Sequence, residues 1–138
     1  NIGQTKTLNR GIELAQGQYL ARQDQDDLSV PTRLKQETEF LDKNPNIVIV
    51  GSASQIMDRT GALYSVIRHP IDDIEVRWHL LYRNPFSHPS VMIRRETLLV
   101  NHLRYDETYC FAQDYALWVE LLRYGQGANI DRPLIYLF

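Results

Sequence analysis

The feature that most limits the fold of this chain is an uninterrupted apolar, β-branched run, Ile47-Val48-Ile49-Val50, which ends at Gly51. A strand covered on both faces has such a run, whereas a strand with one face in water alternates apolar and polar residues. The residues before it predict a helix that opens at Pro31 and stops at Asn44-Pro45-Asn46. A helix followed directly by a doubly covered strand predicts an α/β domain with a largely parallel sheet.

Hydrophobic periodicity and capping residues predict the other elements. Helices are predicted over 5–15, 31–43, 72–83 and 113–124, with a short one between 95 and 100. Strands are predicted over 18–23, 47–51, 55–58, 63–68, 90–93 and 130–138, and Arg59-Thr60-Gly61 is the predicted turn of a hairpin. In the helix over 72–83, Asp72 is the predicted N-cap, and the predicted buried face holds Ile74, Trp78 and Leu81. Pro133 predicts either an edge position or a bend for the last strand.

Length and composition exclude several classes of protein. The 138 residues fit one domain that spans 1–138, and the net charge of −2 gives no electrostatic reason to bind nucleic acid. The sequence contains no run of 18 apolar residues, so it predicts no transmembrane segment. Cys110 is the single cysteine, which excludes an internal disulfide and favours a reducing compartment. The sequence begins with Asn1 rather than Met, so we expect a processed or truncated chain.

An acidic cluster follows the predicted strand over 18–23 and contains Asp24, Asp26 and Asp27. If the backbone stays extended, Asp24 and Asp26 project to the same side. Two carboxylates about 5 Å apart repel by roughly 3 kcal/mol at an effective dielectric constant near 20. Solvation, a raised pKa or a bound cation must relieve that repulsion. One interpretation is therefore a divalent cation that binds a diphosphate, and the other is a solvated acidic turn.

Other metal and phosphate motifs are absent from the sequence. A calcium-binding EF-hand loop that started at Asp24 would need glycine and glutamate where Ser29 and Lys35 stand. No histidine pair has the spacing of a zinc-protease helix, and neither a Walker A motif nor a GxGxxG motif occurs.

Three further residues have both a chemical and a structural interpretation. Asp114 lies at a predicted helix start, where a carboxylate either caps the helix or acts as a general base toward an attacking hydroxyl. His88 lies in a loop with two prolines, where a lone histidine is more often structural than a ligand. Arg94, beside Arg95, either attracts phosphate or forms a surface ion pair.

Taken together and in this order, four segments of the chain resemble the family 2 glycosyltransferases, which have the GT-A fold. The segments are Asn1-Ile2-Gly3 through Ala15-Gln16-Gly17, then Gln23-Asp24-Gln25-Asp26-Asp27 with Pro31 and Arg33-Leu34, then His88-Pro89-Ser90-Val91, and finally Gln113-Asp114-Tyr115-Ala116-Leu117-Trp118. The second resembles the DxD stretch of the family. The resemblance implies a mixed sheet flanked by helices, without the N-terminal nucleotide-binding strands that the family places before Asn1. We therefore expect the central and C-terminal part of a GT-A domain.

The resemblance also implies roles for individual residues. Asp26 would ligate Mg²⁺ or Mn²⁺, Asp24 would contact the metal, its water shell or the nucleotide ribose, and Asp27 would lie beside them in the nucleotide site. Asp114 would activate the acceptor hydroxyl, which gives inversion at the anomeric carbon. The other implied pocket residues are His88, Gln113 and Arg94. Gln113 departs from the family pattern, which often has glutamate at that position.

The partners implied by the resemblance are a nucleotide-diphosphate sugar and a saccharide or lipid-linked acceptor, in polysaccharide biosynthesis. The implied location is cytoplasmic, at the inner face of the membrane. Missing strands could expose apolar sheet surface through which the chain forms a homo-oligomer. Two alternatives stay open: a metal-dependent nucleotidyltransferase and a non-catalytic fragment of a transferase. An aspartate at a late helix start, Asp114, favours the transferase.

Overall fold

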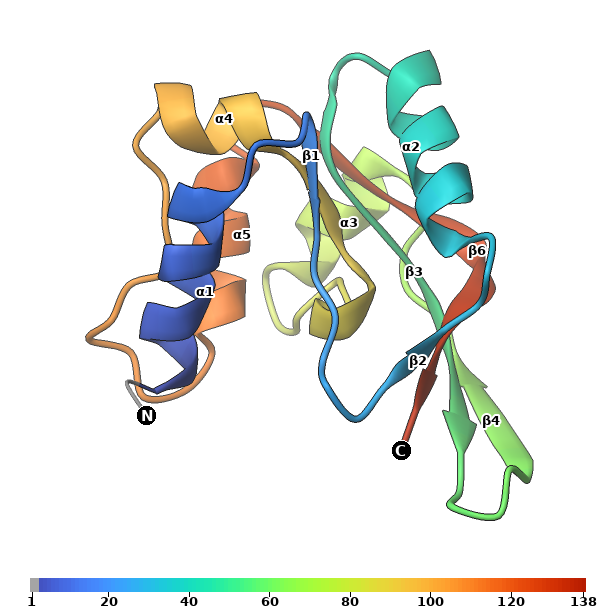
Figure 1. The fold of residues 1–138 in the computed structure, drawn as a ribbon. Helices are drawn as coiled ribbons and strands as arrows, with labels where there is room; N and C mark the ends of the chain where they lie inside the picture. The colour runs from blue at the N-terminus through green and yellow to red at the C-terminus, as the bar shows by residue number, and fades with distance from the viewer. Residues whose placement is uncertain (1–2) are drawn as a thin grey trace.

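Residues 3–138, which are those that the computed structural model describes, form six strands of one mixed sheet flanked by helices (Figure 1). The strands are β1 (Tyr19–Ala21), β2 (Leu28–Ser29), β3 (Ile47–Met57), β4 (Leu63–Ile67), β5 (Met92–Arg94) and β6 (Gln126–Leu137). The helices are α1 (Gln4–Leu14), α2 (Arg33–Lys43), α3 (Asp73–His79), α4 (Arg95–Val100) and α5 (Gln113–Leu121), with the 3₁₀ turn η1 (His88–Ser90). The strand order is β1-β5-β3-β6-β2, and β4 pairs with β3. The predicted α/β class is confirmed, but the prediction of a largely parallel sheet is wrong: of the five strand pairs within residues 3–138, β3–β6 is parallel and the other four are antiparallel.

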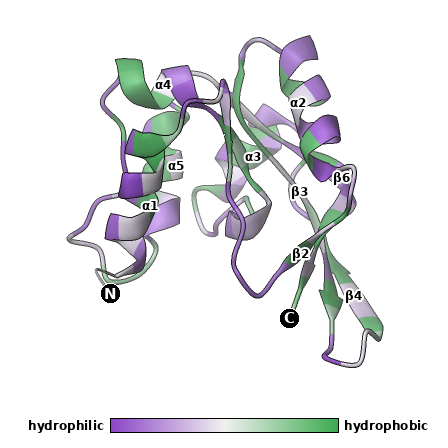
Figure 2. Ribbon diagram, in the orientation of Figure 1, coloured by the Kyte–Doolittle hydropathy of each residue, from purple (hydrophilic) through white to green (hydrophobic). Residues whose placement is uncertain are grey.

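Strand β3 is the centre of the sheet and is buried on both faces, as its β-branched run predicts. It runs parallel to β6 and antiparallel to β4 and β5. Ile49 belongs to the apolar cluster that α5 covers, and the next residue, Val50, packs with Leu41 of α2 in a second cluster. Helices α1, α4 and α5 lie together on one side of the sheet, and α2 covers the other (Figure 1). Apolar residues are accordingly prominent in the first part of β3 and in α5 (Figure 2).

The last strand, β6, tests both interpretations of Pro133. β6 lies between β3 and β2, so the predicted edge position is wrong. The predicted bend is confirmed, because the β3–β6 register shifts on both sides of the pair Ala53–Pro133. Proline cannot donate to a ladder, and such an irregularity accommodates it within a central strand.

The prediction for the buried face of α3 is wrong. Ile74, Trp78 and Leu81 are 82%, 64% and 72% exposed, and Val76 is the buried apolar side chain of this helix. A polar contact sets the orientation, because the Asp73 carboxylate accepts a hydrogen bond from a backbone N–H near the start of β6 at 2.9 Å.

No helix within the described residues is both long and apolar enough to cross a membrane.

Candidate active site

The acidic cluster occupies a turn rather than an extended strand. β1 ends at Ala21, and the backbone N–H of Asp27 donates to the carbonyl of Asp24 at 3.4 Å. The strand alternation expected for Asp24 and Asp26 is therefore wrong, because the chain has already left the sheet. The turn still brings the carboxylates together: one oxygen from each of Asp24, Asp26 and Asp27 lies within 4.8 Å of the others.

The electrostatics of the turn fit a divalent cation. Burial, followed by the charges of Asp24 and Asp26, raises the pKa of Asp27, and a hydrogen bond from the backbone of Phe138 lowers it in part. The repulsion expected from the sequence is therefore present in the folded chain. Hard cations such as Mg²⁺ and Mn²⁺ take carboxylate oxygens as ligands, so three convergent carboxylates are a suitable donor set.

Arg22 is part of this turn, although it was not predicted as a site residue. Its two terminal nitrogens donate to the two carboxylate oxygens of Asp24, at 2.5 Å each. The signal in the sequence is the spacing: on an extended segment, residues i and i+2 share a side, so Arg22 and Asp24 can pair.

A buried ion pair in α2 supports the segment that leads into the turn. Arg33 is 1% exposed and donates to the backbone carbonyl of Arg22 at 2.7 Å and to the carboxylate of Glu37 at 2.9 Å. Burial raises the pKa of Glu37 to about 7, against the opposing charge and hydrogen bond of Arg33. Helix α2, which follows the acidic turn, is thus hydrogen-bonded to the backbone at the end of β1, which precedes the turn.

Asp114 lies in the first turn of α5, but it does not cap the helix. The N-cap is Ala112, in the left-handed region at φ 56°, and it makes no side-chain capping hydrogen bond. One Asp114 oxygen instead accepts a hydrogen bond from the side-chain amide of Asn84 at 2.7 Å. The structure therefore favours an oriented carboxylate over the capping interpretation. Asn84 was not predicted, since its partner is 30 positions away in the sequence.

His88 sits in an aromatic setting at the 3₁₀ turn η1. Its Nε2 lies 2.9 Å from the hydroxyl oxygen of Tyr105, and its ring packs edge-on against Trp118 with ring centroids 5.8 Å apart. Asn9 of α1 fixes Tyr105 through both backbone groups, donating to its carbonyl at 2.8 Å and accepting from its N–H at 2.9 Å. The imidazole is therefore held by groups from three distant parts of the chain.

The pKa of His88 responds to the charges of both the acidic turn and Asp114. Burial, then the positive charge of Arg22, lowers this pKa to about 4, whereas the charges of Asp114 and Asp24 raise it. His88 thus lies within electrostatic reach of both the acidic turn and the start of α5. At neutral pH the ring of His88 is uncharged, so it can donate or accept a hydrogen bond without adding positive charge to its surroundings.

The two remaining predicted pocket residues, Gln113 and Arg94, lie in different parts of the structure. Gln113 stands beside Asp114 at the start of α5, where its side chain donates to Gln4 of α1 at 3.2 Å. Arg94 pairs with Tyr19 at the opposite end of β1 from the acidic turn, so its predicted place in the pocket is wrong. Its guanidinium instead donates to carbonyls at the α2–β3 connection, those of Leu41, Asn44 and Ile47.

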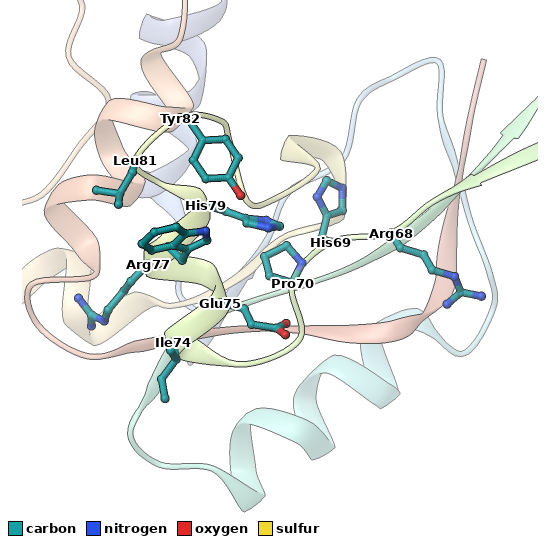
Figure 3. A pocket seen from close by; sticks show the side chains of 10 residues that line it. Arg68, His69, Pro70, Ile74, Glu75, Arg77, His79, Leu81 and Tyr82 are labelled. Atoms are coloured by element: carbon teal, nitrogen blue, oxygen red, sulfur yellow. The ribbon is translucent and has the colours of Figure 1, made fainter.

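A separate hollow of about 820 Å³ lies beside α3 (Figure 3). Its lining combines exposed rings of Trp78 and Tyr82 with the imidazoles of His69 and His79. None of the predicted site residues lines it, so it is distinct from the arrangement around His88.

We expect Glu37 and His88 to change stability with pH in opposite directions. The folded-state pKa of Glu37, about 7, exceeds its ordinary value of 4.5, so its contribution is present at low pH and is lost as pH rises toward 7. The folded-state pKa of His88, about 4, is below its ordinary 6.5, so its contribution is lost as pH falls from 6.5 to 4. Each shift corresponds to about 3 kcal/mol, and the two offset each other.

Urea unfolding at pH 5 and pH 7 separates the contributions of Glu37 and His88 to the free energy of unfolding. Relative to the wild type, the stability of Glu37→Gln should rise by about 2 kcal/mol between these pH values, because the variant lacks the loss that ionisation of Glu37 causes in the wild type. His88→Asn should shift in the opposite direction. An equal difference from wild type at both pH values would contradict the assignment to Glu37.

Known proteins resemble this chain in sequence and in fold. The model of the family described as "Glycosyl transferase family 2" matches residues 1–116. Among curated relatives, the amylovoran biosynthesis glycosyltransferase AmsE of Erwinia amylovora is 27% identical over 136 residues, which are 98% of this chain and 50% of the relative. The O-antigen biosynthesis glycosyltransferase WbnJ of Escherichia coli is 26% identical over 125 residues, 88% of this chain and 46% of the relative. The chain therefore spans about half the length of these relatives.

Solved structures support the same fold. The crystal structure of S. aureus TarS 1–349 in complex with UDP has a TM-score of 0.76 at 18% identity, and covers 99% of this chain and 40% of TarS. The complex of the same protein with UDP-GlcNAc has a TM-score of 0.74 at 17% identity, covering 98% and 38%. At this identity the likeness establishes the shared mixed sheet and its flanking helices.

Proposed function

The chain belongs to glycosyl transferase family 2, and from that premise we propose that it moves a sugar from a nucleotide-diphosphate sugar to an acceptor hydroxyl, with inversion and with the help of a divalent cation. The observation that carries the proposal is the convergence of the Asp24, Asp26 and Asp27 carboxylates within one turn, and the influence of Asp24 and Asp114 on the pKa of His88 agrees with it. A donor diphosphate at the acidic turn and an acceptor hydroxyl at Asp114 would then lie within one site.

Asp26 and Asp24 would hold Mg²⁺ or Mn²⁺, with Asp27 beside them, and the bound cation supplies positive charge that stabilises the departing diphosphate. Asp26 is the most exposed of the three, and Asp24 is engaged by Arg22. The chain's own contribution is to bind the diphosphate at a fixed turn that Arg33 and Arg22 support.

Asp114 would take the proton of the attacking hydroxyl. Asn84 donates to one oxygen of this carboxylate, and the other oxygen, which has no hydrogen-bond partner within residues 3–138, would accept that proton. As the new carbon–oxygen bond forms, the bond from the anomeric carbon to the diphosphate breaks. Inversion follows if the base and the leaving group lie on opposite sides of the reacting carbon.

The names of similar proteins support a substrate class. TarS binds UDP and UDP-GlcNAc, and AmsE and WbnJ serve amylovoran and O-antigen biosynthesis. We extend this to a uridine-diphosphate sugar as donor and a saccharide or lipid-linked acceptor for polysaccharide biosynthesis, at the cytoplasmic face of the membrane. Formation of a homo-oligomer stays a prediction.

Calorimetric titration of the chain with Mn²⁺ and UDP tests the proposal. The wild type should bind UDP only with Mn²⁺ present, and Asp26→Asn should weaken that binding by about a hundredfold, because a charged metal ligand is lost. Asp131→Asn, at an exposed carboxylate of β6, is the matched control and should bind like the wild type. UDP binding that is equal in Asp26→Asn and the wild type would refute the metal–diphosphate site.

A further inference from the structure

Arg22 stands out because a nearly buried guanidinium is held by a single carboxylate. Its side chain is 9% exposed, and Asp24 accepts both of its terminal N–H groups. The Nε–H is buried and has no hydrogen-bond partner within residues 3–138. A buried donor that is left unsatisfied is costly, so this arrangement retains unused capacity to bind an anion.

The backbone of Arg22 is fixed, whereas its guanidinium depends on Asp24. The backbone N–H donates to the carbonyl of Val91 at 2.9 Å, and the carbonyl accepts from Arg33 at 2.7 Å. A change at Asp24 would therefore leave the backbone of Arg22 in place and release only its guanidinium. Arginine has a planar fork of donors that fits carboxylate and phosphate oxygens equally well.

A cation that needs Asp24 must compete with Arg22 for the same two oxygens. The turn holds three carboxylates, and one of them, Asp24, is paired with the guanidinium of Arg22. The cluster therefore keeps a net negative charge that attracts a divalent ion. Once the ion holds Asp24, the guanidinium loses its partner beside the place where a diphosphate would bind. Arg22 and Tyr105 line one cavity, and the positive charge of Arg22 lowers the pKa of both His88 and Tyr105.

We propose that Arg22 is the internal counter-ion of Asp24 in the metal-free site and transfers to the donor's diphosphate when the cation takes Asp24. The inference rests on the proposed function and adds a positively charged diphosphate ligand to it. No covalent bond changes in this exchange: one charge-assisted pair, Arg22 with carboxylate, is replaced by Arg22 with phosphate oxygen. The residue thus links cation binding to nucleotide binding.

The exchange predicts effects of opposite sign in Arg22→Met, which keeps the length of the side chain and removes its charge. Affinity for Mn²⁺ alone should rise about tenfold, because the competitor for Asp24 is gone. Affinity for UDP at saturating Mn²⁺ should fall about tenfold, because the phosphate loses a bidentate partner. A merely structural role would lower both affinities. Mn²⁺ binding is measured by electron paramagnetic resonance and UDP binding by calorimetry.

Arg22→Lys keeps the charge but loses the fork, and it provides a second test if the methionine variant fails to fold. It should bind Mn²⁺ within about threefold of the wild type and bind UDP more weakly. Arg10→Met removes the arginine of an exposed pair with Glu13 on α1 and should change neither affinity.

The outcomes distinguish this inference from the proposed function. If the wild type binds UDP in a manner that needs Mn²⁺ and Asp26, but Arg22→Met binds Mn²⁺ no more tightly, the exchange is overturned. Unchanged UDP affinity in Arg22→Met and Arg22→Lys overturns it as well. If the wild type does not bind UDP with Mn²⁺, the proposed function itself fails, and this inference fails with it.

Discussion

Asp114→Asn should lower the rate of sugar transfer by about a thousandfold and leave UDP affinity almost unchanged, since a positioned general base contributes roughly 10²–10⁴ in rate. Asparagine has the same shape and can still accept the hydrogen bond from Asn84. It cannot take up the proton of the attacking hydroxyl. The loss should therefore appear in kcat rather than in donor binding.

The measurement is the release of UDP from UDP-sugars, with the donor and a saccharide acceptor first selected on the wild type. Asp106→Asn is a suitable control, because Asp106 is an exposed carboxylate whose hydrogen bonds within residues 3–138 are to nearby Thr108. A transfer rate within about tenfold of wild type for Asp114→Asn would remove Asp114 from the role of base.

The second large effect concerns the free energy of unfolding. Arg33→Met should destabilise the chain by about 3–5 kcal/mol at pH 8, because removing one partner of a buried pair leaves the other charge uncompensated. Glu37 is fully buried, and one of its oxygens already lacks a hydrogen-bond partner within the described residues. The carbonyls of Arg22 and Val91 would lose a donor as well.

Urea unfolding measures this effect, and two further variants interpret it. Lys35→Met disrupts an exposed pair of the same spacing on the same helix, with Glu39, and should change stability by no more than about 0.5 kcal/mol. The double variant Arg33→Met/Glu37→Met should recover much of the loss, since an apolar pair needs no charge compensation. A loss below about 1 kcal/mol for Arg33→Met would show that the buried pair has little influence on folding.

Local patterns predicted the elements of the fold well. The run Ile47–Val50 identified the central strand, because only a doubly covered strand lacks alternation. The N-cap at Asp72 is confirmed by its hydrogen bond from the backbone N–H of Glu75 at 2.9 Å. The hairpin turn is confirmed by Gly61 at φ 88°, a backbone angle that favours glycine.

Predictions that depended on distant contacts were less successful. α3 has only seven residues, so its periodicity could not decide which face is buried, and the hydrogen bond from Asp73 to β6 decided it instead. The doublet Arg94-Arg95 suggested phosphate binding, but the sequence does not show which end of a strand lies near the site. The acidic turn was found because its members are adjacent, whereas Asn84 and Tyr105 act through residues far away along the chain.

The hydrogen bonds between Asn9 and Tyr105 also have a consequence for how the molecule folds. They join positions 96 residues apart, and the central parallel pairing of β3 with β6 likewise joins distant segments. Closing long loops costs chain entropy before any contact is gained, so these connections form late. The position of Tyr105 beside His88 depends on α1 through Asn9, and Asp114 is carried by α5. The site is thus a property of the completed chain topology, and no contiguous segment of the polypeptide carries it alone.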